Sequence, residues 1–171
     1  MIYARHESPV GPLLLAGDGV ALKVIGFSEG KGRVDVQAGW QERRDAFADA
    51  IRQLDEYFAG ARRDFELPLA PDGTPFQLRV WQALLAIPYG ATWSYRELAA
   101  AVGNVQAVRA VGLANGRNPL PIVIPCHRVI GSDGSLTGYG GGLATKRALL
   151  ALEHRVLANA GQLDLALDGP F

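Results

Sequence analysis

The sequence predicts a two-domain protein, with a mixed α/β domain over residues 1–72 and an α-helical domain over residues 73–171. Three observations support this division. Short apolar runs separated by turn residues predict strands near the N-terminus. Two capping-box sequences predict helices in the second half. The turn sequence Pro71-Asp72-Gly73 lies between the two patterns and marks the boundary.

Three apolar runs open the first domain, and we expect them to form an antiparallel sheet. Turn residues separate the runs, and the Asp18-Gly19 pair suits a hairpin between the second and the third. A loop rich in glycine and charge is predicted over 29–39. The expected strands cover residues 2–5, 13–16 and 22–27.

One helix and one further strand complete the first domain. Apolar residues at positions 47, 51, 54 and 58 recur at the spacing of one helical face, and Gly60 is placed to end that helix. Apolar and polar residues then alternate over 65–69, which predicts an edge strand. This domain is therefore expected to be a sheet covered by one helix.

The second domain is predicted to hold a pair of helices joined by a tight turn. The sequence 74–77 opens a helix that stops at Pro88, and 94–97 opens another that ends near Gly103. Only Gly103 and Asn104 precede the next helical stretch, 105–114, so the pair is a helix-turn-helix candidate. An ordinary αα-corner is the alternative. A last helix is expected around 143–153, and the tail after His154 has no clear pattern.

Charge is distributed unevenly along a chain whose net charge is zero. Residues 1–75 carry 9 basic and 12 acidic side chains, whereas the stretch from Arg79 to Arg147 carries 7 basic and 2 acidic ones. A net charge of zero excludes a protein that binds nucleic acid or membranes through positive charge over its whole surface. The excess of positive charge from Arg79 to Arg147 nevertheless predicts that any contact with a polyanion lies in the second half. Hydrophobic residues at 49% and charged residues at 20% are typical of a globular protein.

The chain contains one cysteine, Cys126. A single thiol excludes an intramolecular disulfide and a zinc site built on several cysteines, and it suits a reducing compartment. The N-terminus has no signal-peptide pattern, and no run of 18 or more apolar residues predicts a membrane span. We therefore expect a cytoplasmic protein that does not contact a membrane.

Cys126 is followed at once by His127 and Arg128, which favours a reactive thiol. A cysteine reacts as the thiolate, which a neighbouring cation, a histidine or a helical first turn after Pro125 stabilises. His127 is a candidate base, acting across a turn or through a water. A carboxylate should orient its ring, and Glu153, in a poor electrostatic position near a helix end, is a better candidate than Asp133. The alternative is that Cys126 is a buried small hydrophobe.

Two further features permit functional and structural interpretations. Glycines surround Tyr139 over 138–142, where they suit either a close approach to a ligand or a surface loop. The stretch 105–114 has small residues, among them Ala107 and Ala110, that suit a nucleic-acid groove and close helix packing equally. Its one charge, Arg109, is either solvated or inserted into a base stack.

The segment Pro125-Cys126-His127-Arg128-Val129 resembles the active-site sequence of the O6-alkylguanine DNA alkyltransferases, also called methylated-DNA–protein-cysteine methyltransferases. The resemblance is dense from about residue 54 to residue 153 and weak over the first 50 residues. The other matching segments are Gly73-Thr74 with Phe76-Gln77 and Val80-Trp81, Ile87-Pro88-Tyr89-Gly90, Ser94-Tyr95 with Glu97-Leu98-Ala99, Arg109-Ala110-Val111-Gly112, Asn118-Pro119, Gly138-Tyr139 with Gly141-Gly142, Lys146, and Leu149-Leu150 with Glu153.

The resemblance implies a fold and a reaction. The first domain is expected to resemble ribonuclease H without its active site, and the second to carry a winged helix-turn-helix. The implied reaction is transfer of an alkyl group from O6 of a flipped-out guanine, and from O4 of thymine, to Cys126. The resulting thioether consumes the protein. The implied partner is double-stranded DNA carrying O6-alkylguanine, bound by a chain that is monomeric in solution, with cooperative binding on DNA left open.

The resemblance also implies roles for individual residues. Cys126 is the expected acceptor, with His127 as its base through a water and Glu153 orienting the ring. Tyr139 is expected to donate to the departing guanine, and Asn118 to brace the turn before the active loop. Val129 and Gly140 are expected beside the substrate. The residues expected at the DNA are Ser94, Tyr95, Ala107, Arg109, Ala110 and Arg117.

Within this set, Tyr95 is expected to crowd the phosphate 3′ to the lesion, and Arg109 to fill the stack that the flipped base leaves. No cofactor is expected. Some relatives bind zinc through N-terminal cysteines, which this chain lacks, so no metal is expected either. The alternative function is a non-catalytic protein that binds alkyl lesions. A cysteine hydrolase using Cys126 and His127 is a third hypothesis, and it predicts turnover.

Overall fold

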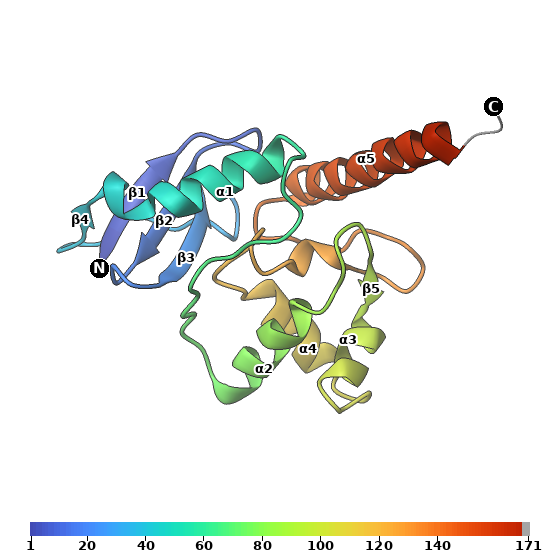
Figure 1. Ribbon diagram of the computed structural model, residues 1–171. Coiled ribbons are helices and arrows are strands. Elements are labelled where there is room, and N and C mark those ends of the chain that lie inside the picture. The colour runs from blue at the N-terminus through green and yellow to red at the C-terminus, as the bar shows by residue number, and fades with distance from the viewer. Residues whose placement is uncertain (169–171) are drawn as a thin grey trace.

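The computed structural model describes residues 1–168, with the side chains of 1–161, as two parts joined by an extended segment (Figure 1). The first part holds β1 (Ile2–His6), β2 (Leu13–Gly17), β3 (Leu22–Phe27), β4 (Gln41–Glu42), the 3-10 helix η1 (Arg44–Phe47) and α1 (Ala48–Phe58). The second holds α2 (Pro75–Leu84), β5 (Trp93–Ser94), α3 (Tyr95–Ala101), α4 (Val108–Gly116), the 3-10 helix η2 (Cys126–Arg128), β6 (Val129–Ile130) and α5 (Leu143–Asp168).

The first part is a sheet in the order β3-β2-β1-β4, with α1 lying across one face (Figure 1). The three longer strands are antiparallel, as the sequence predicts. Asp18 closes the hairpin between β2 and β3, because its Oδ1 accepts hydrogen bonds from the backbone N–H groups of Val20 and Ala21. β4 was not expected, and it extends the sheet by pairing in parallel with β1.

The buried face of α1 differs from the predicted one by a small rotation. Ala50, Leu54 and Tyr57 are buried against the sheet and the second part, whereas Ile51 and Phe58 are half-buried. Both sets of positions have helical spacing, so the spacing alone does not choose between neighbouring faces. The helix ends as predicted, with Gly60 at a positive φ of 76°.

The edge strand predicted over 65–69 was wrong, because only an isolated bridge forms there. Leu22 of β3 accepts from the N–H of Ala70 and donates to the carbonyl of Pro68, and the pairing extends no further. Pro68 has no N–H to continue a ladder. The backbone at Glu66 instead exchanges two hydrogen bonds with the buried side chain of Gln53 in α1.

The helix pair of the second part forms with different boundaries from those expected. Thr74 and Gln77 make both bonds of a capping box at α2, and the Ser94 hydroxyl accepts from the N–H of Glu97 at the start of α3. The second helix of the pair starts at residue 108 rather than 105. Asn104 accounts for the delay, since its side chain and carbonyl accept from the next residues and hold 104–107 in a turn.

The two short strands β5 and β6 bring the helix pair to the cysteine segment. They pair in parallel, with Trp93 opposite Val129 and Ser94 opposite Ile130. The start of α3 therefore lies beside the residues that directly follow η2. This contact joins the expected DNA-contacting region to the expected active loop.

The last helix, α5, continues well past the predicted segment and extends away from the body of the molecule (Figure 1). The sequence after His154 is rich in alanine and leucine, which have high helix propensity. Its first turns pack into the core through Leu149 and Leu152. Among the described residues, no helix is long and apolar enough to span a bilayer.

Candidate active site

Cys126 is the first residue of η2 and follows a tightly braced turn. Ile122 in this turn has a φ of 75°, a left-handed conformation that is strained for a β-branched residue. Asn118 spans the turn, because its Nδ2 donates to the carbonyl of Ile124 and its Oδ1 accepts from the N–H of Leu120, at 2.8 and 3.0 Å. Asn118 therefore braces the turn that precedes Cys126.

A cavity of about 630 Å³ opens beside Cys126, between the two parts of the molecule. From the second part, Cys126, Asn118, Tyr139, Gly140 and Arg117 line it. From the first part, β3 and the loop that follows it form the opposite wall. Val129, predicted beside the substrate, does not line this cavity; its side chain is buried and its carbonyl accepts from Lys146 Nζ at 2.7 Å.

His127 is completely buried and hydrogen-bonded to Glu153, with Nε2 and Oε2 separated by 2.7 Å. An ionised carboxylate only accepts, so Nε2 carries the hydrogen and Nδ1 carries the free lone pair. Within the described residues, buried Nδ1 has no hydrogen-bond partner. Burial lowers the pKa of His127 despite the attraction of Glu153, so the ring is neutral and Nδ1 is available as a base.

Glu153 is the centre of a buried cluster that we call the Glu153 cluster: Glu153, Tyr57, Gly90, His127 and Arg128. Burial alone would raise the pKa of Glu153, but hydrogen bonds from His127 and Arg128 lower it below its ordinary value. Arg128 Nε donates to Oε1 at 2.8 Å, and the Gly90 N–H donates to the same oxygen at 3.1 Å. The Tyr57 hydroxyl donates to Oε2 at 2.7 Å. Glu153 is therefore a fixed, ionised acceptor.

Burial raises the pKa of the Cys126 thiol to about 11, although a hydrogen bond from Asn118 and the charge of Lys146 oppose the rise. The thiol is therefore protonated at neutral pH and needs a base to become a nucleophile. His127 is adjacent in the chain, but no direct hydrogen bond joins its ring to Cys126 among the described contacts. Proton transfer between them therefore requires a bridging group.

The glycines around Tyr139 bring the active loop against the first part of the molecule. The N–H of Gly32 donates to the carbonyl of Gly140 at 2.8 Å, and a Cβ on Gly141 would lie 2.8 Å from the ring of Phe27. The Tyr139 ring meets Phe27 edge-on, with centroids 5.8 Å apart. Its hydroxyl is buried and has no partner among the described residues, so an unused donor lies at the cavity.

Comparison with known proteins identifies the family of the chain. Residues 1–71 match the family described as 6-O-methylguanine DNA methyltransferase, ribonuclease-like domain, and residues 75–155 match 6-O-methylguanine DNA methyltransferase, DNA binding domain. The chain belongs to the 6-O-methylguanine DNA methyltransferase family. This confirms the resemblance found in the sequence and the two-part fold expected from it.

Relatives in this family match nearly the whole chain. A methylated-DNA–protein-cysteine methyltransferase of Methanosarcina barkeri is 54% identical over 157 residues, covering 92% of this chain and 99% of the relative. One from Mycobacterium leprae is 52% identical over 166 residues, covering 96% and 100%. A crystal structure of Mycobacterium tuberculosis OGT in complex with DNA superposes with a TM-score of 0.86 at 50% identity, covering 91% of this chain and 94% of that one.

The residues predicted to contact DNA lie near the start of α3 and along α4. Ser94 ends β5 and Tyr95 begins α3, Ala107 directly precedes α4, and Arg117 directly follows it. Arg109, Ala110 and Arg117 are exposed, and Ala107 is half-buried. The opposite side of α4 packs inward through Val111 and Ala114, and Ala114 accepts a hydrogen bond from Trp81 Nε1 at 2.9 Å. The small residues of α4 are thus divided between close packing and an open surface.

Tyr95 and Ser94 lie where α3 begins, and both are half-buried. The Ser94 side chain caps α3, so its hydroxyl is already occupied. The Tyr95 hydroxyl is hydrogen-bonded to the Thr137 hydroxyl, which belongs to the loop carrying Tyr139. Tyr95 therefore joins the helix pair to the active loop.

Sequence reasoning missed three donors to Glu153: Tyr57, Gly90 and Arg128. Arg128 was noticed only as a charge beside Cys126. Tyr57 and Gly90 are distant in the sequence, and no local pattern points to their contact with Glu153. Among the side chains that the structure describes, no group of three or more histidine, cysteine or acidic residues is arranged to hold a metal ion.

Proposed function

We propose that this chain repairs alkylated DNA by moving the alkyl group from O6 of guanine to Cys126. Its family and its relatives' names support the reaction class. The observation that carries the assignment to particular residues is Cys126, which lines a cavity of about 630 Å³ with the His127–Glu153 pair buried behind it. That volume suits a single flipped-out nucleobase, since ligand pockets span about 300–1,000 Å³.

In the proposed reaction His127 Nδ1 takes the proton of the Cys126 thiol through a water molecule. The sulfur attacks the alkyl carbon, a C–S bond forms, and the bond between that carbon and O6 breaks. The electron pair of the broken bond returns to guanine, which the Tyr139 hydroxyl stabilises by donating a hydrogen bond. The thioether is stable, so each protein molecule reacts once.

The duplex must present the base outside its stack, since a buried O6 is out of reach of a side chain. Exposed Arg109 is proposed to fill the vacated stack, and Tyr95 to press on the phosphate 3′ to the lesion. Ala107 and Ala110 would allow α4 to approach the groove closely. Arg117 is proposed as a phosphate contact, and Gly140, which lines the cavity, as backbone beside the substrate.

The division into domains at residue 72 is part of this proposal. No helix or strand spans residues 70–74, and the capped start of α2 follows directly. We further propose a cytoplasmic location, supported by a DNA substrate and a single thiol that must remain reduced to react.

The test is incubation of the protein with a duplex carrying O6-methylguanine labelled in the methyl group. Label should appear on Cys126, identified by peptide mapping, at no more than one methyl group per molecule. Cys126→Ser should take up no label while keeping affinity for the duplex. Multiple turnover would indicate a hydrolase, and binding without transfer would indicate a lesion-binding protein; either result contradicts the proposal. A duplex with O4-methylthymine tests the second substrate.

A further inference from the structure

Tyr57 belongs to the first part of the molecule, yet its hydroxyl bonds to the carboxylate proposed to orient His127. It lies in the last turn of α1, 96 residues away in sequence from Glu153, and its exposed fraction is 0%. The proposed function uses no residue of α1. Tyr57 is therefore a buried polar group to which the proposed reaction assigns no role.

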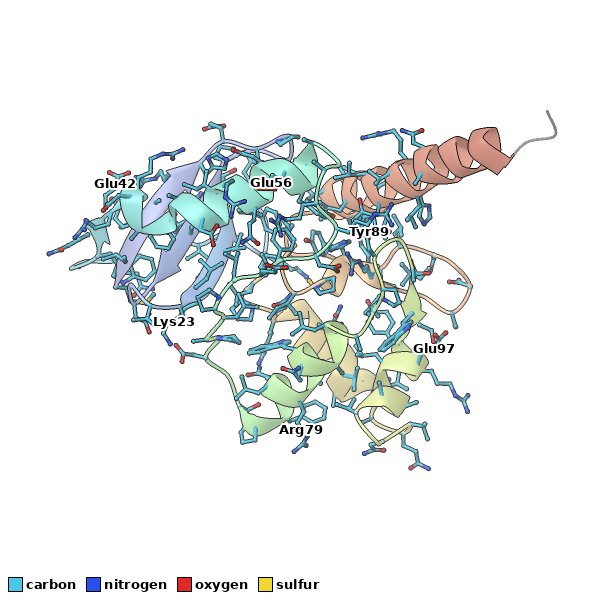
Figure 2. All side chains as sticks on the ribbon, in the orientation of Figure 1. Lys23, Glu42, Glu56, Arg79, Tyr89 and Glu97 are labelled. Atoms are coloured by element: carbon cyan, nitrogen blue, oxygen red, sulfur yellow. The ribbon has the colours of Figure 1, made fainter. Side chains whose placement is uncertain are left out.

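The ring of Tyr57 is held on three sides by aromatic neighbours. Its centroid lies 5.4 Å from those of Phe58 and Phe65 and 6.3 Å from that of Tyr89. Tyr89 marks the junction of the two parts below α5 in Figure 2. A ring packed in this way keeps its hydroxyl at one place, so it can fix the position of the group to which it donates.

Tyr57 and His127 share one oxygen of the Glu153 carboxylate. Tyr57 donates to Oε2, the same oxygen that accepts from His127 Nε2, and both distances are 2.7 Å. Arg128 holds both oxygens, since its Nε donates to Oε1 at 2.8 Å and its Nη2 donates to Oε2 at 3.1 Å, and the Gly90 N–H donates to Oε1. A carboxylate torsion is soft, and the bond from Arg128 to Oε2 is longer than the bonds that Tyr57 and His127 make with the same oxygen. Tyr57 therefore adds a short hydrogen bond, from the first domain, at the oxygen that holds the histidine.

The Tyr57 hydroxyl keeps its proton at neutral pH and so remains a donor there. Burial, followed by the negative charge of Glu153, raises the pKa of Tyr57 far above its ordinary value. The Tyr57 oxygen therefore keeps its proton and never competes with His127 for one. Its effect on Glu153 is steric and directional, and it does not depend on titration of Tyr57.

We infer that Tyr57 is a positioning residue for alkyl transfer: its hydroxyl fixes the Glu153 oxygen that orients His127, so the first domain completes the proton relay of the second. This inference rests on the proposed function. It makes the ribonuclease-like domain part of the active centre through one hydroxyl group. It also explains why a fully buried tyrosine, rather than phenylalanine, lies at the end of α1.

The experiment compares Tyr57→Phe with a matched control, Tyr89→Phe. Both changes remove one buried phenolic hydroxyl from the same aromatic group, but within the described residues the Tyr89 hydroxyl has no hydrogen-bond partner. Two quantities are measured on the full chain, at a temperature well below the thermal unfolding midpoints of both variants. One is the single-turnover rate of methyl transfer, and the other is the proton resonance of the His127 Nε2–H.

Tyr57→Phe should slow transfer by about five- to tenfold and should shift the Nε2–H resonance. The expected loss of rate is smaller than the full worth of a hydrogen bond to a charged group, because Arg128 Nη2 still donates to Oε2. Tyr89→Phe should leave the rate within about twofold and the resonance in place. A wild-type rate for Tyr57→Phe overturns the inference, and so does a slow variant with an unshifted resonance. An equal loss in both variants overturns it too, because it indicates packing alone. If the unmodified protein transfers no methyl group, the proposed function fails instead, and the resonance still tests the contact.

Discussion

The Glu153 cluster and the exposed surface of α4 differ in how completely their polar groups are satisfied before DNA arrives. In the cluster, Glu153 accepts from Tyr57, Gly90, His127 and Arg128, and it is fully buried. On α4, Arg109 and Ala110 are exposed. The carboxylate proposed to orient His127 is thus fixed in advance, whereas the side chains proposed for DNA contact are left open.

This difference separates two kinds of energetic cost. A preorganised donor or acceptor costs no rearrangement when the reaction occurs, so its loss should appear in the rate of the chemical step. A surface arginine gains its contacts only in the complex, so its loss should appear in the handling of duplex DNA. Substitutions in the Glu153 cluster should therefore change the rate of the chemical step, and substitutions on the surface of α4 should change base flipping.

The largest effect is expected from Glu153→Gln in the cluster. The new amide can donate to His127 Nε2 and favour the wrong tautomer, so methyl transfer should fall by at least about 100-fold. It also leaves buried Arg128 without its counter-charge, which costs about 3–5 kcal/mol of stability. Single-turnover rates and thermal unfolding midpoints measure the two effects. Duplex affinity should change by less than about threefold, and a comparable loss of affinity would erase the distinction between the regions.

A smaller effect, confined to duplex substrates, is expected from Arg109→Ala. Flipping a base costs a few kcal/mol, of which one inserted side chain offsets a part, so duplex repair should slow by about 10- to 30-fold. Reaction with free O6-alkylguanine base needs no flipping and should keep its rate. Arg79→Ala is the charge-matched control, since Arg79 lies exposed on α2 (Figure 2). An equal loss with the free base would contradict the stack-filling role.

The sequence predicted the parts of this comparison unequally. The three long strands and both capped helices followed from local patterns of turn and capping residues, and the family followed from the resemblance of the segment 125–129 and the other matching segments. Glu153 was singled out on the expectation that it lies near a helix end, but that expectation was wrong, since α5 continues to Asp168 and Glu153 lies in its middle. Tyr57 was not singled out, because its contact depends on how two domains meet. The shift of α4 to residue 108 and the loss of the strand at 65–69 arose from single side chains, Asn104 and Gln53, that compete for backbone groups.

The hydrogen bond between Tyr95 and Thr137 joins α3, the helix paired with α4, to the loop that carries Tyr139, so breaking it should have a modest effect on duplex repair. Thr137→Val removes the partner of the Tyr95 hydroxyl without changing the size of the side chain. We expect duplex repair to slow by about threefold, the equivalent of one partly exposed hydrogen bond. Tyr95→Phe should have a similar effect. The double variant should be no slower than either single one, and additive losses would show that the two hydroxyls act separately.

The smallest effect is expected from pH, and it distinguishes a proton relay from free ionisation of the thiol. Burial lowers the pKa of His127, which faces Glu153, Arg128 and Lys146, so the ring remains neutral to below its ordinary value of about 6.5. The transfer rate should therefore change by less than about twofold between about pH 6.5 and 8.5, and should fall only at more acidic pH. A thiol with a pKa of about 11 that reacted only after ionising freely would instead give a rate that rises about tenfold per pH unit over this range. The free energy of unfolding should also fall at acidic pH. Below about pH 6.5 the unfolded chain binds a proton on His127 that the folded chain does not bind, so acid favours the unfolded chain. The thermal unfolding midpoint should therefore decline below that pH.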